Sequence, residues 1–97
     1  MRPFLLTLTV LDLFVAHGST YGLDLVAASR GRLKRGSVYV TLGRMEHRKL
    51  VKSRLEDRAG QGPPRRLYDA TPLGLRALVA TQLLEGDLPL KALRARS

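Results

Sequence analysis

The spacing of apolar residues changes abruptly near residue 50, and this change restricts the folds that the chain can adopt. Up to that point apolar residues recur at helical spacing, which predicts a helix over residues 37–49. From residue 51 they alternate with polar residues, as in a half-buried strand. The turn-forming residues 57–64 precede a returning strand that ends at residue 70. Residues 50–70 are therefore predicted to form a β-hairpin.

Further helices are predicted on both sides of the hairpin. Residues 4–17 form an apolar first helix, and residues 21–29 form a short second one. A fourth helix begins at Pro72 and ends near Glu85, and its amphipathic pattern continues in a tail to residue 93.

Hydroxyl side chains are predicted to cap three of these helices. Such side chains accept a hydrogen bond from an unpaired amide of the first helical turn. We expect Ser19 or Thr20 to cap the second helix and Ser37 to cap the third. Thr71 precedes a proline at the first helical position, which is a start signal for the fourth helix.

The order of these elements predicts the fold class. Three helices, a two-stranded hairpin and another helix form the sequence of a winged helix-turn-helix domain. We predict one mainly α domain of the α+β class over residues 1–97. Residues 20–49 are its helix-turn-helix, residues 50–70 its wing, and residues 72–93 an additional C-terminal helix and tail.

Positive charge is concentrated in the middle of the chain. The whole sequence carries 17 Lys and Arg against 8 Asp and Glu, a net charge of +9. Residues 30–66 hold 12 of the basic and three of the acidic residues, so this segment accounts for the full +9. A basic segment between nearly neutral ends indicates a surface that binds an acidic partner.

The third helix is the element predicted to enter a DNA major groove. Val38, Leu42 and Met45 form its inward stripe, which leaves the opposite face for contact with DNA. The candidate recognition residues are Ser37, Tyr39, Thr41, Arg44 and Arg48. The candidate backbone and wing contacts are Lys34, Arg35, Arg54, Arg58, Arg65 and Arg66.

The first helix is apolar on more than one side, which indicates contact with a second copy of the chain. The candidate residues of this homodimer interface are Phe4, Leu8, Leu11, Val15, Leu75, Leu78, Val79 and Leu83. A signal peptide is the competing interpretation, but Asp12 interrupts the apolar run and weighs against it. We therefore expect a cytoplasmic protein without a membrane span.

The sequence contains little that could support catalysis or metal binding. It has no Cys and two His, His17 and His47, which fall on different elements. A structural zinc site is therefore not expected, and we predict no metal and no cofactor. Gly60-Gln61-Gly62 is followed by proline and not by a helix, so it does not fit a phosphate-binding loop. We expect a protein that is not an enzyme.

Several separated motifs resemble the PadR family of bacterial transcriptional regulators over roughly residues 5–80. The motifs are Tyr21-Gly22-Leu23-Asp24-Leu25, Gly36-Ser37-Val38-Tyr39, Leu42-Gly43-Arg44-Met45-Glu46, Leu50-Val51, Pro64-Arg65-Arg66-Leu67-Tyr68 and Thr71-Pro72-Leu73-Gly74. The resemblance implies a dimeric winged helix-turn-helix protein, usually a repressor, with Tyr39 and Arg44 near DNA. The chain departs from the family pattern at Val40 and Gly43, so base specificity is not carried over. It departs again at Ala70, where buried volume is lost but the cap is kept.

These observations favour a homodimeric regulator, a repressor, that binds double-stranded DNA in a sequence-specific manner. A basic architectural or RNA-associated protein that binds nucleic acid without sequence choice is the main alternative, because the charge alone permits it. A protein-interaction module is a third interpretation, but it would not need twelve basic residues in one segment. A small-molecule effector would fit between the first and fourth helices, although no residue identifies one.

Overall fold

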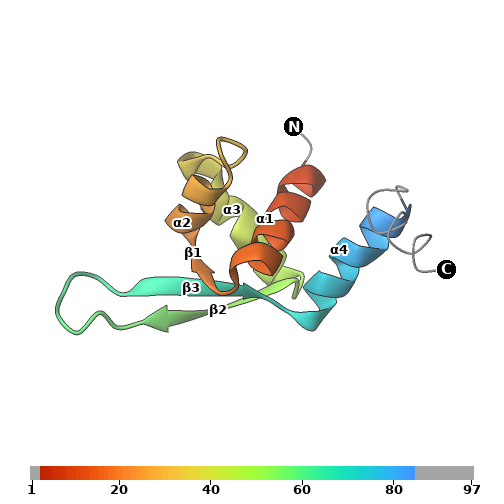
Figure 1. The fold of residues 1–97 in the computed structure, drawn as a ribbon. Coiled ribbons are helices and arrows are strands. Elements are labelled where there is room, and N and C mark those ends of the chain that lie inside the picture. The colour runs from red at the N-terminus through yellow and green to blue at the C-terminus, as the bar shows by residue number, and fades with distance from the viewer. Residues whose placement is uncertain (1–2, 85–97) are drawn as a thin grey trace.

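The structure is a computed structural model that describes residues 3–84 (Figure 1). The elements in chain order are α1 (Pro3–His17), β1 (Thr20–Tyr21), α2 (Gly22–Ala28), α3 (Arg35–His47), β2 (Val51–Glu56), β3 (Arg65–Ala70) and α4 (Pro72–Leu84). The predicted tail over residues 87–93 and the side chain of Phe4 lie outside the described part of the chain. The predicted α+β class and the order of helices, hairpin and further helix are confirmed.

A short strand that the sequence analysis did not predict completes the sheet. β1 pairs with β3, which also pairs with β2, so the antiparallel sheet has the order β1-β3-β2. The strands β2 and β3 extend well past the helices, and their loop forms the tip of the wing (Figure 1).

Two of the predicted helix caps are wrong. Thr20 lies in β1, where its backbone pairs opposite Tyr68 and its hydroxyl donates to the Gly18 carbonyl at 2.8 Å. α2 therefore starts after Tyr21, which makes no side-chain cap bond. α3 begins two residues before Ser37, and its cap position is Lys34, again without a side-chain cap. Backbone pairing and the preceding turn fix these starts in place of a capping hydroxyl.

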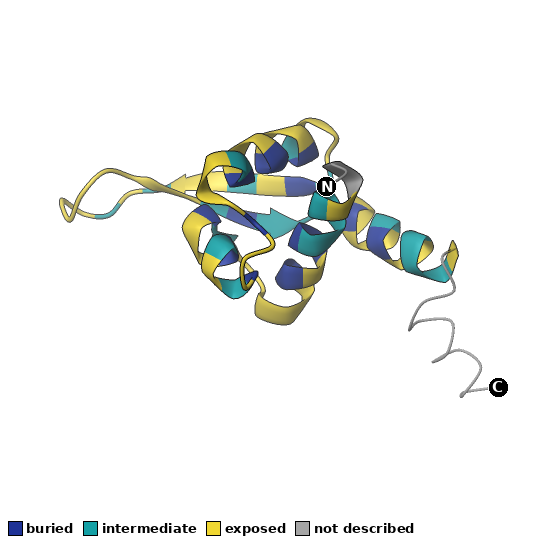
Figure 2. Ribbon diagram, turned by 90° about the horizontal axis from the view of Figure 1, so that it is seen from above, coloured by how far each residue is buried: buried dark blue, intermediate teal, exposed yellow. Residues whose placement is uncertain are grey.

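The core lies between the helices and the inner face of the sheet (Figure 2). The predicted inward stripe of α3 is confirmed, because Val38, Leu42 and Met45 are all buried. The other core residues are Val10, Leu11, Leu13 and Phe14 of α1, Leu25 of α2, Leu33, Val51, Tyr68 and Leu78.

A buried serine fixes the turn between α2 and α3. The Ser29 hydroxyl donates to the Val26 carbonyl at 2.8 Å and accepts the Leu33 amide at 2.9 Å. The Leu33 amide is buried, and a buried amide without a partner is costly. These two bonds hold Leu33 in the core and thereby set where α3 begins.

The end of α3 has an unusual backbone conformation. The amides of Lys49 and Leu50 reach back to the carbonyls of Glu46 at 3.0 Å and Met45 at 2.9 Å. This closure requires a left-handed residue, and Lys49 adopts it with φ of +66°. Glycine normally occupies this position because a Cβ atom is unfavourable there.

The start of α4 is joined tightly to the same place. The Thr71 hydroxyl accepts the Gly74 amide at 3.0 Å, which confirms the predicted cap, and donates to the Lys49 carbonyl at 2.6 Å. The Thr71 amide donates to the Leu50 carbonyl at 3.0 Å. A Cβ atom on Gly74 would lie 2.1 Å from that carbonyl oxygen, so only glycine fits.

Replacing Lys49 by glycine is expected to stabilise the fold. The substitution removes the left-handed strain of a residue with a side chain, and the gain is about 0.5–1 kcal/mol. Urea unfolding of Lys49→Gly should show a higher midpoint than wild type. A lower midpoint would contradict the assigned conformation.

Replacing Gly74 by alanine is expected to destabilise the fold by about 1–3 kcal/mol, because α4 must move away from Leu50. Gly43→Ala is the matched control, since a Cβ atom on this helical glycine meets no atom within 4 Å. The control should be neutral or stabilising, because alanine is the better helix former. Equal unfolding midpoints for the two variants would show that the contact with Leu50 is unimportant.

Candidate nucleic-acid interface

The exposed face of α3 is narrower than the sequence analysis predicted. Thr41 was expected on this face, but its side chain is only 6% exposed and packs with the inward stripe. Its position, three residues after Val38 and four before Met45, places it on the buried side of the helix. The interpretation of Thr41 as an outward residue is therefore wrong.

The remaining candidates on α3 are accessible in different degrees. Arg44, and Arg48 at the C-cap, are exposed, whereas Ser37 is half-buried. Tyr39 is 50% exposed, and one edge of its ring lies against Gly22 of α2. A Cβ atom on Gly22 would come within 2.6 Å of Tyr39 Cε1, so this glycine lets the two helices meet. Tyr39 thus both joins α2 to α3 and presents part of its ring to solvent.

Most of the basic candidates lack an acidic partner. Lys34 and Arg35 are exposed at the start of α3, and Arg58 is half-buried in the loop of the wing. Within residues 3–84 the one side-chain ion pair joins Arg54 to Glu56, at 3.2 Å. Uncompensated guanidinium groups on one surface attract phosphate.

A polar network at the outer face of the sheet positions two arginines, Arg54 of β2 and Arg65 of β3. The Tyr21 hydroxyl donates to Glu56, which also accepts from Arg54. The guanidinium carbon of Arg65 lies 3.7 Å from the centre of the Tyr21 ring, a cation–π contact. β1 is thereby attached through side chains to the ends of β2 and β3 nearest the tip, as well as through its backbone to β3.

A second network connects α3 to the wing. Ser53 of β2 donates to Glu46 of α3 at 2.6 Å and accepts from Arg66 of β3 at 3.1 Å. Sequence reasoning did not identify Glu46 and Glu56 as positioning residues. The signal was present, because they are two of the three carboxylates in an otherwise basic segment.

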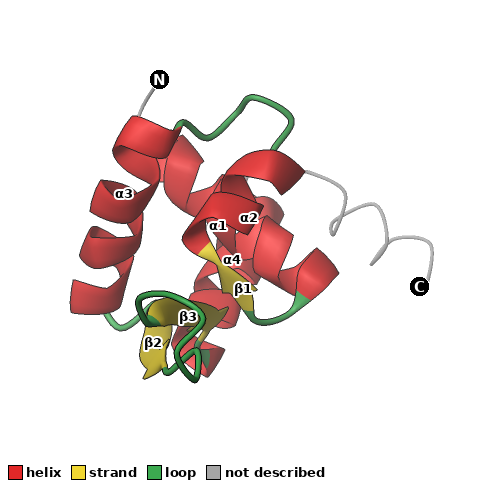
Figure 3. Cartoon of the chain, turned by 90° about the vertical axis from the view of Figure 1, so that its left-hand side faces the viewer, coloured by secondary structure: helices red, strands yellow, loops and turns green. Residues whose placement is uncertain are grey.

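Figure 3 shows α3 beside the wing, so the two candidate DNA-contacting elements belong to one side of the protein. Tyr68 lies beneath the second network and is buried. Burial raises the pKa of its hydroxyl above the usual value, and the nearby Arg66 opposes part of this rise. Tyr68 is therefore a neutral residue of the core.

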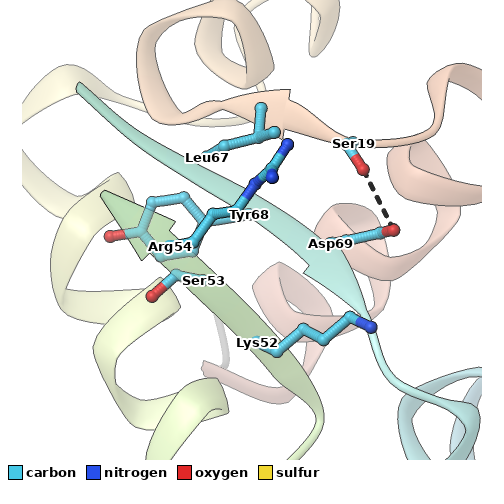
Figure 4. A pocket seen from close by; sticks show the side chains of 7 residues that line it. All are labelled: Ser19, Lys52, Ser53, Arg54, Leu67, Tyr68 and Asp69. Atoms are coloured by element: carbon cyan, nitrogen blue, oxygen red, sulfur yellow. Dashed lines mark hydrogen bonds between the residues drawn. The ribbon is translucent and has the colours of Figure 1, made fainter. Parts of the chain in front are cut away.

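Two hollows flank the wing. One of about 350 Å³ is lined by Ser19, Lys52, Arg54 and Asp69 among others, and Ser19 donates to Asp69 at 3.0 Å (Figure 4). The other, of about 410 Å³, lies between the wing and the residues around Gly22 and Tyr39. Neither hollow lies between α1 and α4, where an effector was expected.

Among the described residues, no group of three or more His, Asp or Glu side chains could hold a metal ion. The same part of the chain contains no helix long and apolar enough to cross a membrane.

The candidate dimer residues divide into two groups. Leu11 and Leu78 lie in the core of the chain itself, so their side chains are already covered. Val15, Leu75 and Val79 are exposed at 61%, 40% and 50%, and Leu8 and Leu83 are half-buried. On α4, a shallow and largely apolar surface is lined by Leu75, Arg76, Val79, Ala80 and Leu83.

Comparisons with known proteins agree on one family. The model of the transcriptional regulator PadR-like family matches residues 10–80. No curated protein matches the sequence. Among solved structures, a PadR-like transcription factor from Bacteroides fragilis has a TM-score of 0.76 and 23% identity, over 99% of this chain and 89% of that one.

Two further structures have the same fold. A PadR family regulator from Eggerthella lenta has a TM-score of 0.70 and 28% identity, over 81% of this chain and 70% of that one. PadR of Bacillus subtilis, solved in complex with operator DNA, has a TM-score of 0.70 and 18% identity, over 79% of this chain and 46% of that one. With a winged helix-turn-helix fold and a family match over residues 10–80, the chain belongs to the PadR-like family of transcriptional regulators.

Proposed function

We propose that this protein is a cytoplasmic repressor that binds double-stranded DNA in a sequence-specific manner as a homodimer. The observation that carries the proposal is the exposed, unpaired Arg44 on a recognition helix whose opposite face is buried. A guanidinium group at this place can donate two hydrogen bonds to the edge of a guanine. The Bacillus subtilis PadR structure in complex with operator DNA lends support from the same fold.

The other basic residues have a different role in this proposal. Lys34 and Arg35 precede or begin α3, where the helix N-terminus also favours a phosphate. Arg58, Arg65 and Arg66 of the wing bind the phosphate backbone of the DNA. These contacts fix the orientation of the protein on the duplex without reading the base sequence. A repressor of this kind acts by occupying its operator and excluding the transcription machinery.

The exposed apolar surface of α1 and α4 supports the homodimer. Val15, Leu75 and Val79 together with the half-buried Leu8 and Leu83 are the side chains that a second copy would cover. A two-fold dimer places its two recognition helices about 34 Å apart, one turn of duplex. The operator is then a pseudo-palindrome with half-sites at that spacing.

Substituting Arg44 separates sequence-specific from general binding. Arg44→Ala should weaken binding to a selected operator by about 1–3 kcal/mol, with a smaller loss on scrambled duplex, because a base contact is lost. Arg58→Ala should weaken both alike and reduce the salt dependence. Lys52→Ala, which removes an exposed charge that is not among the candidate DNA or dimer contacts, is the control and should bind as wild type does. Anisotropy titrations at several salt concentrations measure all four proteins.

Equal losses for Arg44→Ala and Arg58→Ala on every duplex would contradict sequence-specific binding. They would favour the architectural function, in which affinity depends on charge alone and falls steeply as the salt concentration rises.

An acidic substitution on α4 tests the dimer. Val79→Asp puts a charge into the apolar surface, and burying a charge without a partner is costly. We expect the variant to sediment as a monomer. It should lose most of its operator affinity, because a monomer can bind only one of the two half-sites. Thermal unfolding verifies that the exposed substitution leaves the protomer folded. A dimer of unchanged strength would place the interface elsewhere.

A further inference from the structure

The outward face of α3 carries two glycines, which have no side chain. The buried residues Val38, Leu42 and Met45 define one side of the helix. The opposite side passes through Gly36, Val40 and Gly43 and ends at the exposed His47. A Cβ atom on either glycine would meet no atom within 4 Å. Val40 is therefore the one branched side chain between two glycines on this ridge, and it is 53% exposed.

Val40 has no packing role among the described residues. It lies outside the core and makes up none of the apolar surface on α1 and α4. Single exposed aliphatic residues are common, so exposure alone carries no conclusion. The position does, because the flanking glycines let the helix backbone approach a surface closely and leave Val40 as the side chain that projects toward it between them.

The charges around Val40 identify that surface as DNA. Arg44 lies one helical turn further on the same side, and Arg35 begins the helix. The major groove offers one apolar group at a base edge, the C5-methyl group of thymine. Cytosine has a hydrogen in its place, and the minor groove has no equivalent.

We propose that Val40 is a specificity-determining residue that contacts the C5-methyl group of a thymine in the operator. This inference rests on the proposed function, since it requires α3 to lie in the major groove. Arg44 and Val40 would then read neighbouring bases, the first by hydrogen bonds and the second by apolar contact.

Uracil substitution tests the contact directly, because uracil lacks only that methyl group. A duplex is first enriched from a random pool with the wild-type protein, and each thymine is then replaced by uracil in turn. At the contacted position the affinity should fall about fourfold for each methyl group, the effect of uncovering one methyl-sized group.

Two variants complete the test. Val40→Ala should bind thymine and uracil duplexes equally, while its thermal unfolding stays close to that of wild type. Leu55→Ala is the matched control, because Leu55 is an apolar residue of the wing that is 59% exposed. The wing is expected to follow the phosphate backbone or the minor groove of the DNA and not the major groove. It should keep the full ratio of thymine to uracil affinity.

The outcomes separate the inference from the function beneath it. Selective binding that tolerates uracil at every position would overturn the role of Val40 and leave the proposed function intact. Persistent uracil sensitivity in Val40→Ala would assign the methyl contact to another side chain and overturn the inference as well. If no duplex is enriched, the proposed function fails, and the role of Val40 fails with it.

Discussion

The backbone of Leu50 is the point on which the arrangement of the domain depends. Its amide closes the end of α3, and its carbonyl receives the amide of Thr71 at the start of α4. The next residue, Val51, begins the wing and is buried in the core. One residue therefore fixes the angles between the recognition helix, the wing and α4. The left-handed Lys49 and the obligatory Gly74 are both consequences of bringing these three elements so close together.

Carboxylates have a positioning role on the basic side of the molecule. Glu46 is tied through Ser53 to Arg66, and Glu56 is tied to Tyr21 and Arg54. An isolated surface ion pair contributes little to stability, but shared acceptors that join α3, β1 and the wing restrict how these elements move. The arginines of the strands are thus partly oriented before DNA is present. Arg44 is held by no such partner among the described residues, so its donors are free for the base contact that we propose.

The fold was predictable because periodicity and turn residues are local signals. The switch from helical to alternating spacing located α3 and the hairpin, and Thr71 with Pro72 located α4. β1 was not predictable in this way, because two residues show no period and this strand exists only through pairing with Tyr68 and Leu67 far along the chain. The failed cap at Thr20 has the same cause, because this residue is paired with β3. The start of α3 at Lys34 follows from the turn that Ser29 holds and not from a capping hydroxyl.

The charges of the candidate nucleic-acid interface were predictable from the sequence, but its geometry was less so. Lys, Arg and their clustering are visible in composition, so the basic residues of α3 and the wing were identified. Thr41 was misplaced because its polarity suggested solvent, whereas helical geometry puts position 41 beside 38, 42 and 45. Val40 was not a candidate for a similar reason, because polar residues were sought on this face and valine is apolar. On a recognition helix the angular position of a residue decides whether it can reach a base. Its chemistry decides only which base feature it can contact, and thymine is the base whose feature is apolar.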